Sequence, residues 1–355
     1  MKICFVNDTF LVGRGVDTVI YELASRLGKK HEVKVICGKG LCNYKPKNFD
    51  IKEIDIGKAF TESLKDFLLP LKLLKLRREL RKIDCDVVNL HHSTLFIGLV
   101  GMKNVIVTYH GSPPAYGLLK YPRTFVNILG RVLLRFAKKV ITISEYLKKE
   151  LIKFGVPEEK IVVIPNGVSE EFKPTREDKN YMLFVGRLER HKRVEELIRL
   201  AKEIEFPLKI VGDGPERKKL EEFARKINAP VTFVGNVSRK QLIKFYQECS
   251  FFVSTSRWEG FGLIFLEANA CGKPVIGYNL AAIKERIENG INGFLVKSFK
   301  EFKNRAETLK NDKKYREKLG INGLNVVKHY KWGNISKTYE KAFFQKVSKG
   351  RINSP

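Results

Sequence analysis

The chain has 355 residues and a formal net charge of +28, from 67 basic and 39 acidic side chains, and 43% of its residues are hydrophobic. Its length exceeds that at which one hydrophobic core usually stops growing, which argues against a single small domain and predicts two domains with a core each. The charge attracts phosphate-bearing ligands, anionic membranes or nucleic acid, and by itself does not choose among them.

Three further features constrain the compartment. The longest apolar stretch, 95–107, is interrupted by Lys103 and Asn104 and is shorter than the roughly 20 residues that span a bilayer. The N-terminal apolar run at 3–6 is too short for a signal peptide. The cysteines at 4, 37, 42, 85, 249 and 271 form no Cys-x-x-Cys pair and no zinc-like spacing with histidine, which predicts reduced, mostly buried thiols. We therefore expect a cytoplasmic protein that is soluble or peripheral at the inner face of the membrane.

Short β-rich apolar runs alternate with helical periodicity throughout the chain. In the first half they predict strands at 2–6, 32–37, 87–90, 104–109, 140–143 and 160–164. In the second half they predict strands at 181–185, 208–211, 231–234, 251–253, 273–276 and 293–296, and then helices at 299–310, 312–328 and 334–348. This alternation is typical of parallel sheets covered by helices, so each half is predicted to be a doubly wound α/β unit.

A turn at 165–167 and a polar stretch at 172–180 predict a linker between the halves. We place an N-terminal domain at 1–170 and a C-terminal domain at 171–333, with helix 334–348 packing back on the first domain. Open parallel sheets bind ligands beyond the carboxyl ends of their strands. We therefore expect two facing domains, a deep cleft between them, and chemistry shared by both.

Gly13 and Gly15 follow the first predicted strand, where a glycine-rich turn can bring backbone N–H groups to a phosphate. The full G-x-G-x-x-G dinucleotide fingerprint is absent because position 18 is a threonine. An ordinary loop between a strand and a helix is the alternative interpretation.

Histidines and aspartates flank other strands of the first half. His91, His92 and His110 end strands, where an imidazole can hydrogen-bond a sugar hydroxyl or a developing charge, although a lone histidine there is more often structural. Asp84 and Asp86 match the Asp-x-Asp of metal-binding sugar transferases. They precede a strand, at the end opposite to that where ligands gather, so we predict no metal site.

Two turns of the second half also follow strands. Gly186-Arg187 is followed by Lys192, and two cations at a strand end can hold a diphosphate and neutralise the charge that builds up as a sugar leaves. A solvated basic helix start is the alternative. Gly212 and Asp213 form a tight turn at the end of the next strand, on the side expected to bind ligands.

Glu259 and Glu267 enclose Gly260-Phe261-Gly262 and an apolar stretch that predicts the start of a buried helix. The unpaired N–H groups and the positive dipole end of such a helix stabilise phosphate oxygens. A carboxylate such as that of Glu267 can accept both hydroxyls of a ribose diol. Two glutamates at this spacing are common in helices, and the glycines before the apolar run make a sugar-nucleotide site the better interpretation.

In this combination and order the chain resembles the retaining glycosyltransferases of family 4, which have the GT-B fold of two facing Rossmann-like domains. The resemblance covers nearly the whole chain. It is carried by Gly13 and Gly15, Tyr109-His110-Gly111, the segments 141–145, 164–168 and 211–215, Gly186-Arg187-Leu188 with Lys192, and the Glu259/Glu267 pair.

The resemblance implies a role for each matching residue. Glu267 would accept the ribose hydroxyls of the donor, and Glu259 would contact hydroxyls of its sugar. The diphosphate would be bound by Arg187, Lys192 and the backbone N–H groups of Gly260, Phe261, Gly262 and the Gly13–Gly15 loop, with Gly212 and Asp213 also in the donor site. His110 would contact the transferring sugar. The implied reaction is a front-face attack that retains the anomeric configuration, with the leaving phosphate helping to deprotonate the acceptor and no metal or other cofactor.

The chain departs from the family pattern at two places. The N-terminal loop of the family usually has adjacent glycines followed by a glutamate, whereas here Arg14 separates the glycines and Asp17 stands near the acidic position. The residue after Lys192 is commonly glycine and here is Arg193. Arg193 therefore adds a cation near the phosphates or extends into solvent.

We therefore expect a retaining hexosyltransferase that uses a nucleotide diphosphate sugar in glycolipid, polysaccharide or glycan synthesis. A nucleic-acid-binding protein is disfavoured, because the basic charge is spread over both halves instead of one recognition module. A catalytically inactive sugar-nucleotide-binding protein is the other alternative. The presence of Arg187, Lys192, Glu259 and Glu267 favours the enzyme.

Two basic segments of the first half favour a lipid-linked or anionic acceptor. The stretch 87–144 contains no acidic residue, and its basic residues are Lys103, Lys120, Arg123, Arg131, Arg135, Lys138 and Lys139. The stretch 64–82 interleaves leucines and Phe67 with Lys65, Lys72, Lys75, Arg77, Arg78, Arg81 and Lys82. A basic amphipathic helix of this kind can lie in a membrane interface. A core-facing helix with a solvated basic face is an equal alternative for either segment alone.

Overall fold

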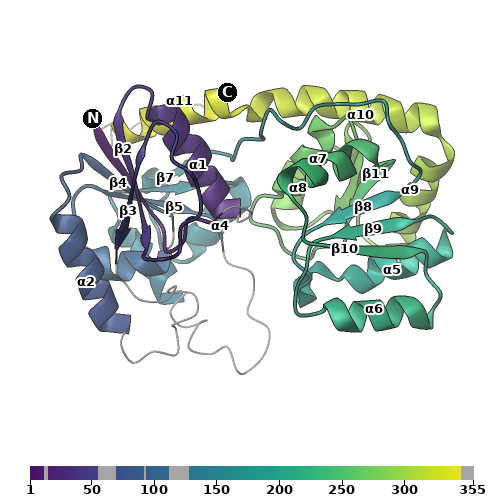
Figure 1. The fold of residues 1–355 in the computed structure, drawn as a ribbon, viewed down its shortest axis with the longest axis horizontal. Coiled ribbons are helices and arrows are strands. Elements are labelled where there is room, and N and C mark those ends of the chain that lie inside the picture. Colours follow the sequence, from purple (N-terminus) through teal and green to yellow (C-terminus); the bar gives the residue numbers. More distant parts are fainter. Residues whose placement is uncertain (12–14, 55–68, 92, 112–127, 345–355) are drawn as a thin grey trace. The chain divides into compact units, whose positions relative to one another are not determined.

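The computed structural model describes residues 1–11, 15–54, 69–91, 93–111 and 128–344. The chain forms two compact units (Figure 1), of which the first comprises Met1–Asn166 with Trp332–Pro355 and the second comprises Gly167–Lys331. Each unit is an α/β layer structure with a parallel sheet.

The first unit contains a seven-stranded sheet with the order β3-β2-β1-β4-β5-β6-β7, in which all neighbouring strands are parallel. Its strands are β1 (Lys2–Val6), β2 (Glu32–Gly38), β3 (Asp50–Ile54), β4 (Val87–Leu90), β5 (Val105–Tyr109), β6 (Lys139–Thr142) and β7 (Ile161–Val163). The strand order reverses at β1, so the ends of β1 and β4 flank the point where open α/β sheets bind ligands.

Strand β3 is absent from the sequence-based prediction. It lies at the edge of the sheet and its residues Asp50–Ile54 are mostly part-exposed, with only Ile54 buried. An edge strand with little buried surface needs no continuous apolar run, and this removes the signal by which the other strands are recognised.

Among its described residues, the first unit has the α-helices α1 (Gly15–Leu27), α2 (Leu69–Arg81), α4 (Glu145–Lys153) and α11 (Trp332–Phe344). Helix α11 packs on α1, as Figure 1 shows, although more than 300 residues separate them in the chain. Trp332, Tyr339 and Phe343 of α11 join Phe5 and Leu23 in the buried core of this unit. This apolar face fastens the end of the described chain to the first unit.

Cys4 and Cys85 form a disulfide with a Cα–Cα distance of 6.1 Å. The prediction that all cysteines are reduced thiols is therefore wrong for this pair, whereas Cys37, Cys42, Cys249 and Cys271 are free. The parallel pairing of β1 with β4 places the two sulfurs together across 81 residues of sequence. No local spacing motif can show such a contact.

The second unit contains a six-stranded parallel sheet with the order β10-β9-β8-β11-β12-β13. Its strands are β8 (Met182–Val185), β9 (Leu208–Val211), β10 (Val231–Gly235), β11 (Phe251–Ser254), β12 (Val275–Tyr278) and β13 (Gly293–Val296). Its helices are α5 (Val194–Glu203), α6 (Arg217–Lys226), α7 (Arg239–Glu248), α8 (Leu263–Ala270), α9 (Phe299–Asn311) and α10 (Lys313–Val327). The predicted parallel sheets covered by helices are thus confirmed in both halves.

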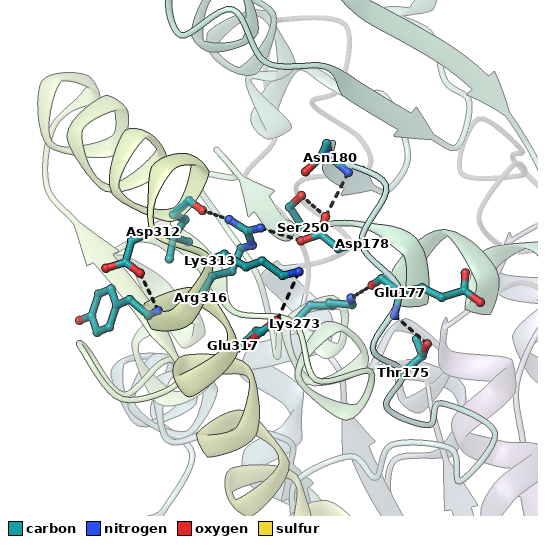
Figure 2. Close-up of polar contacts among 12 residues, drawn as sticks. Thr175, Glu177, Asp178, Asn180, Ser250, Lys273, Asp312, Lys313, Arg316 and Glu317 are labelled. Carbon is teal, nitrogen blue, oxygen red and sulfur yellow. Dashed lines mark hydrogen bonds and ion pairs between the residues drawn. The ribbon is translucent and has the colours of Figure 1, made fainter.

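The segment 172–180, predicted as a linker, is fastened to the second unit by polar contacts (Figure 2). The Asp178 carboxylate accepts hydrogen bonds from Arg316 Nη2 at 2.7 Å, from the Ser250 hydroxyl and from the Asn180 backbone N–H at 3.0 Å. Lys273 donates to the carbonyl oxygen of Glu177. Because the partners of Asp178 come from the strand region near β11 and from α10, the segment is held as part of this unit.

Candidate functional site

Gly212 lies at the end of β9, directly beside the end of β8. Its φ is +122°, and a Cβ atom at this position would lie 2.2 Å from the carbonyl oxygen of Gly186. Only glycine allows both this backbone conformation and this close approach. The two turns predicted from the sequence, after β8 and after β9, are therefore in direct contact at the carboxyl edge of the sheet.

Asp213 organises the second of these turns. Its carboxylate accepts hydrogen bonds from the Gly214 N–H at 2.7 Å and from Arg217 Nη1 at 2.9 Å. The Gly214 N–H, followed by Arg217, holds the pKa of the Asp213 carboxyl below its usual value. The side chain is therefore an anion that orders the entry into α6, while its predicted donor contact stays a prediction.

Lys192 and Glu259 are brought together although 67 residues separate them. Lys192 Nζ donates to Glu259 Oε1 at 2.6 Å, and both side chains are only 13% exposed. A lysine and a carboxylate that are largely shielded from solvent at this distance form a charge-assisted hydrogen bond. Two residues that the sequence placed in the donor site are thus neighbours at one point of the second unit.

Backbone contacts hold the two segments that contain this pair. The Thr255 hydroxyl lies 2.9 Å from the carbonyl oxygens of both Lys192 and Arg193, and the Arg257 N–H donates to the carbonyl oxygen of His191 at 2.9 Å. Sequence reasoning did not identify Thr255 or Arg257. Their only signal was their position between β11 and the glycine-rich loop.

Arg193 has a defined place in this arrangement. Its φ of +50° lies in the left-handed region, which explains why glycine suits this position. Its guanidinium pairs with Glu196 at 2.9 Å. The same carboxylate accepts from Arg257 Nη2 at 3.0 Å and from the Tyr278 hydroxyl at 2.6 Å. The expected additional cation therefore belongs to a network that holds the Lys192 segment.

Arg187 lies at the end of β8 and is 72% exposed, with its Nε 3.0 Å from Glu189 Oε1. An exposed ion pair of this kind is worth little in water. The guanidinium can therefore exchange Glu189 for a phosphate group at small cost.

The loop Gly260-Phe261-Gly262 leads into α8. Gly262 is the N-cap of the helix with a φ of +84°. Phe261 is buried, its carbonyl oxygen accepts from Arg286 Nε at 3.1 Å, and the Arg286 guanidinium lies 4.1 Å from the centre of its ring. Arg286 was not recognised in the sequence. Its contacts with the carbonyl oxygen and the ring of Phe261 hold the loop directly before the helix N-terminus.

Glu267 lies on α8 and is buried. Its Oε2 accepts a hydrogen bond from the Tyr246 hydroxyl at 2.9 Å, and its Oε1 lies 3.6 Å from Arg239 Nη1. Burial raises the pKa of the Glu267 carboxyl above its usual value, while Arg239 and the Tyr246 hydroxyl oppose this shift. The carboxylate is thus a hydrogen-bond acceptor fixed in the second turn of the helix.

In the first unit, His91 and His110 follow the adjacent strands β4 and β5. His91 Nδ1 lies 2.9 Å from His110 Nε2, and the two rings stack with centroids 5.1 Å apart. Burial, together with the neighbouring His110, holds the pKa of His91 well below its usual value. His91 is therefore neutral, and one of the two facing nitrogens donates a hydrogen bond to the other. His92 lies outside the described residues.

Asp17 anchors the loop that follows β1. Its buried carboxylate accepts hydrogen bonds from Asn7 Nδ2 at 2.7 Å, from the Thr9 hydroxyl at 2.9 Å and from the Leu11 N–H at 2.8 Å. Gly15 opens α1 just before it. Asp17, the acidic residue noted as a departure from the family pattern, thus holds residues 7–11 of this loop by hydrogen bonds. Gly13 and Arg14 lie outside the described residues.

Asp84 and Asp86 lie at the N-terminal end of β4 and pair with Lys2. Asp84 forms an ion pair with the Lys2 ammonium, and Asp86 Oδ2 accepts from the Lys2 backbone N–H at 2.8 Å. Both carboxylates therefore contact Lys2 of the neighbouring strand β1. They lie at the N-terminal end of β4, whereas His91 follows its carboxyl end.

Comparison with known proteins identifies the family. Residues 13–172 match the model of Glycosyltransferase Family 4, and residues 168–326 match that of Glycosyl transferases group 1. An uncharacterized glycosyltransferase of Methanocaldococcus jannaschii is 34% identical over 279 residues, which cover 73% of this chain and 77% of the relative. The chain belongs to the group 1 glycosyltransferases.

The fold of this glycosyltransferase is shared with solved structures. Sucrose-phosphate synthase from Thermosynechococcus elongatus aligns with a TM-score of 0.84 at 20% identity, covering 96% of this chain and 98% of the other. HepE of Anabaena, solved in complex with UDP and glucose, aligns with a TM-score of 0.78 at 19% identity over 96% and 99% of the two chains. The predicted GT-B class is therefore confirmed, and at these identities the likeness concerns the fold alone.

Proposed function

We propose that this glycosyltransferase moves a hexose from a nucleotide diphosphate sugar to an acceptor hydroxyl with retention of the anomeric configuration and without a metal. The observation that supports this best is the part-buried Lys192–Glu259 contact at 2.6 Å. It lies in one unit with the glycine-rich N-terminus of α8 and with the buried acceptor Glu267. This set offers a cation, a helix N-terminus and two carboxylates to a ligand with phosphates and hydroxyls.

The proposed reaction assigns each group a task. Arg187, Lys192 and the N–H groups at the start of α8 stabilise the negative charge that grows on the diphosphate as its bond to the anomeric carbon breaks. The acceptor oxygen bonds to that carbon on the same face, and its proton passes to the leaving phosphate oxygen. Glu259 binds a hydroxyl of the sugar, Glu267 binds the ribose, and His110 donates to or accepts from a sugar hydroxyl.

A donor screen tests the proposal. Uridine, guanosine and adenosine diphosphate sugars are incubated with the protein and a simple glycoside acceptor, and product is detected by mass spectrometry. Uridine diphosphate glucose is the first choice, since the fold is shared with a protein solved with UDP and glucose. NMR of the product reports its anomeric configuration. An inverted product contradicts retention, and binding of a donor without transfer or hydrolysis favours the inactive sugar-nucleotide-binding protein.

We further propose that the acceptor is lipid-linked or anionic and that the protein contacts an anionic membrane surface peripherally. In α2, Leu76 and Leu80 are buried, whereas Leu74 is 61% exposed next to the exposed Lys75 and Arg78. The helix therefore combines a core-facing side with an outward apolar residue among cations. None of the described helices is long and apolar enough to cross a membrane.

A second exposed apolar residue of the first unit supports the same proposal. Phe136 is 56% exposed, with the Arg135 guanidinium 5.0 Å from its ring centre. Three of the basic residues of these two segments, at 65, 120 and 123, lie outside the described residues.

Co-sedimentation with vesicles tests membrane contact. Binding to vesicles with about one third anionic lipid at low salt is expected to fall for Leu74→Ser and Phe136→Ser. The exposed Ile321→Ser of the second unit is the matched control and is expected to bind as before. Equal binding of all variants, or no binding of the wild type to anionic vesicles, contradicts the membrane part of the proposal.

A further inference from the structure

The carboxylate of Glu267 is held between two side chains of α7. Tyr246 is fully buried and its hydroxyl donates to Glu267 Oε2 at 2.9 Å. Arg239 approaches the other oxygen, with Nη1 3.6 Å from Oε1. Helices α7 and α8 pack side by side in the second unit, so both contacts come from a neighbouring rigid element.

Arg239 is itself placed from several directions. It is the first residue of α7, directly after the N-cap Ser238, which forms a capping box with Gln241. Its Nε lies 3.2 Å from Glu171 Oε2, and its guanidinium lies 4.4 Å from the ring centre of Phe172. A planar guanidinium suits this combination of stacking and ion pairing in a way that an ammonium group does not. The contacts with Glu171, Phe172 and Glu267 therefore fix the position of the Arg239 guanidinium.

The charge balance at Glu267 depends on this arginine. The titratable groups that face the carboxylate are Arg239 and Tyr246 of α7 and Cys271 at the end of α8. Burial disfavours the charged carboxylate, and Arg239 is the cation that opposes this effect. Tyr246 contributes a neutral hydrogen bond, and its own pKa is raised well above its usual value by burial and by Glu267.

We propose that Arg239 is a positioning residue for donor binding, which holds the Glu267 carboxylate as an anion with Oε1 ready to accept the ribose hydroxyls. The inference rests on the proposed function of Glu267 as the ribose acceptor. Because Glu267 Oε2 already accepts a hydrogen bond from the Tyr246 hydroxyl, Oε1 is the oxygen that accepts the hydrogen bonds of the ribose diol. Arg239 thereby acts on the ribose through Glu267, whereas the phosphates are bound elsewhere on the same unit.

The test compares a ribose ligand with the same ligand without its diol. Uridine, guanosine and adenosine diphosphates and their 2′,3′-dideoxy forms are titrated calorimetrically from pH 5 to 9. The ratio of the two affinities isolates the diol, since both ligands share the base and the titrating phosphates. The proteins are the wild type, Arg239→Met, Arg239→Lys, Glu267→Gln and Lys240→Met, the last being the matched control because Lys240 is the exposed neighbour on α7.

For Arg239→Met we expect the ratio at pH 7 to fall on the order of tenfold, the effect of weakening one charge-assisted hydrogen bond. The ratio should also begin to fall at a higher pH than in the wild type as the solution is acidified, because Glu267 takes up its proton more readily without the cation. Arg239→Lys should restore only part of the ratio, because the positive charge is kept while the planar guanidinium is lost. Lys240→Met should resemble the wild type in both respects.

Other outcomes overturn the inference. An equal loss of affinity for the ribose and dideoxy ligands in Arg239→Met shows a merely structural role, and an unchanged ratio and pH profile shows no role. If Arg239→Met does not fold, the same measurement on Arg239→Lys and Glu171→Gln decides, since an unaltered ratio in both contradicts the proposal. A wild type that does not distinguish the two ligands, with Glu267→Gln without effect, contradicts instead the proposed role of Glu267.

Discussion

The two units place candidate site residues at the same kind of position, beyond the carboxyl ends of parallel strands, and equip them with different chemistry. In the second unit, the contact between Lys192 and Glu259 at 2.6 Å and the exposed Arg187 supply full charges. In the first unit, the neutral His91 lies in hydrogen-bond contact with His110 at 2.9 Å. Charges suit a diphosphate and neutral hydrogen-bonding groups suit sugar hydroxyls, so the proposed function assigns the diphosphate to the second unit and a sugar hydroxyl to His110.

The largest effect is expected from Arg187→Ala. Its charge matters most as the leaving phosphate forms, so kcat should fall about 10²- to 10³-fold, the loss typical of one transition-state donor, while nucleotide binding falls less. Steady-state rates with the donor found in the screen, together with calorimetric binding, measure both quantities. The exposed Lys202→Ala of α5 is the control. Unchanged turnover in Arg187→Ala rejects the assigned role.

Gly212→Ala should destabilise the second unit. The added Cβ would lie 2.2 Å from the carbonyl oxygen of Gly186, and a φ of +122° is strained for alanine. We expect the free energy of unfolding to fall by about 1–3 kcal/mol, measured by urea denaturation. Gly290→Ala shares a positive φ but has nothing within 4 Å, so a loss of equal size in both variants would show that the conformation alone, without the close approach, is responsible.

His110→Ala should affect the sugar and spare the nucleotide. We expect kcat/KM for the donor to fall about tenfold, the size of one hydrogen bond to a sugar hydroxyl, while the affinity for the nucleoside diphosphate stays within twofold of the wild type. Kinetics and calorimetry on the same preparation give the comparison. A parallel loss of nucleoside diphosphate affinity would contradict the division between charged and neutral groups.

The buried His91 should make the stability of the first unit depend on pH. Its pKa is lowered in the folded state, so below the ordinary value of about 6.5 the unfolded state binds more protons and stability falls as the pH falls. The slope contributed by one such group approaches about 1.4 kcal/mol per pH unit. Urea denaturation of the wild type and His91→Gln between pH 5 and 8 should show a smaller slope in the variant. Identical slopes would contradict the neutral, buried state of His91.

The smallest effect is expected from a chelator. In the proposed reaction Arg187, Lys192 and the N-terminus of α8 neutralise the diphosphate, so transfer should proceed in EDTA at the same rate. Loss of activity that magnesium or manganese restores would contradict the metal-free proposal and return attention to Asp84 and Asp86.

Much of the site could be predicted from the sequence because it depends on local chemistry. Glycines next to strand ends, as at Gly186 and Gly212, and an apolar run after Gly262 are signals within a few residues of each other. The predicted strands, the two α/β halves and the family follow from such signals and their order. Glu267 could be placed on a helix with the same reasoning, since α8 begins at Leu263.

Tertiary structure alone decided the contacts between distant segments. The disulfide of Cys4 with Cys85 depends on the pairing of β1 with β4, and the contact of His91 with His110 depends on the adjacent ends of β4 and β5. The contact of the Arg239 guanidinium with the Glu267 carboxylate depends on how α7 packs beside α8. The reason is that local periodicity determines what a segment becomes, whereas the order of strands in a sheet and the packing of helices on it determine which side chains meet, and these depend on the whole chain.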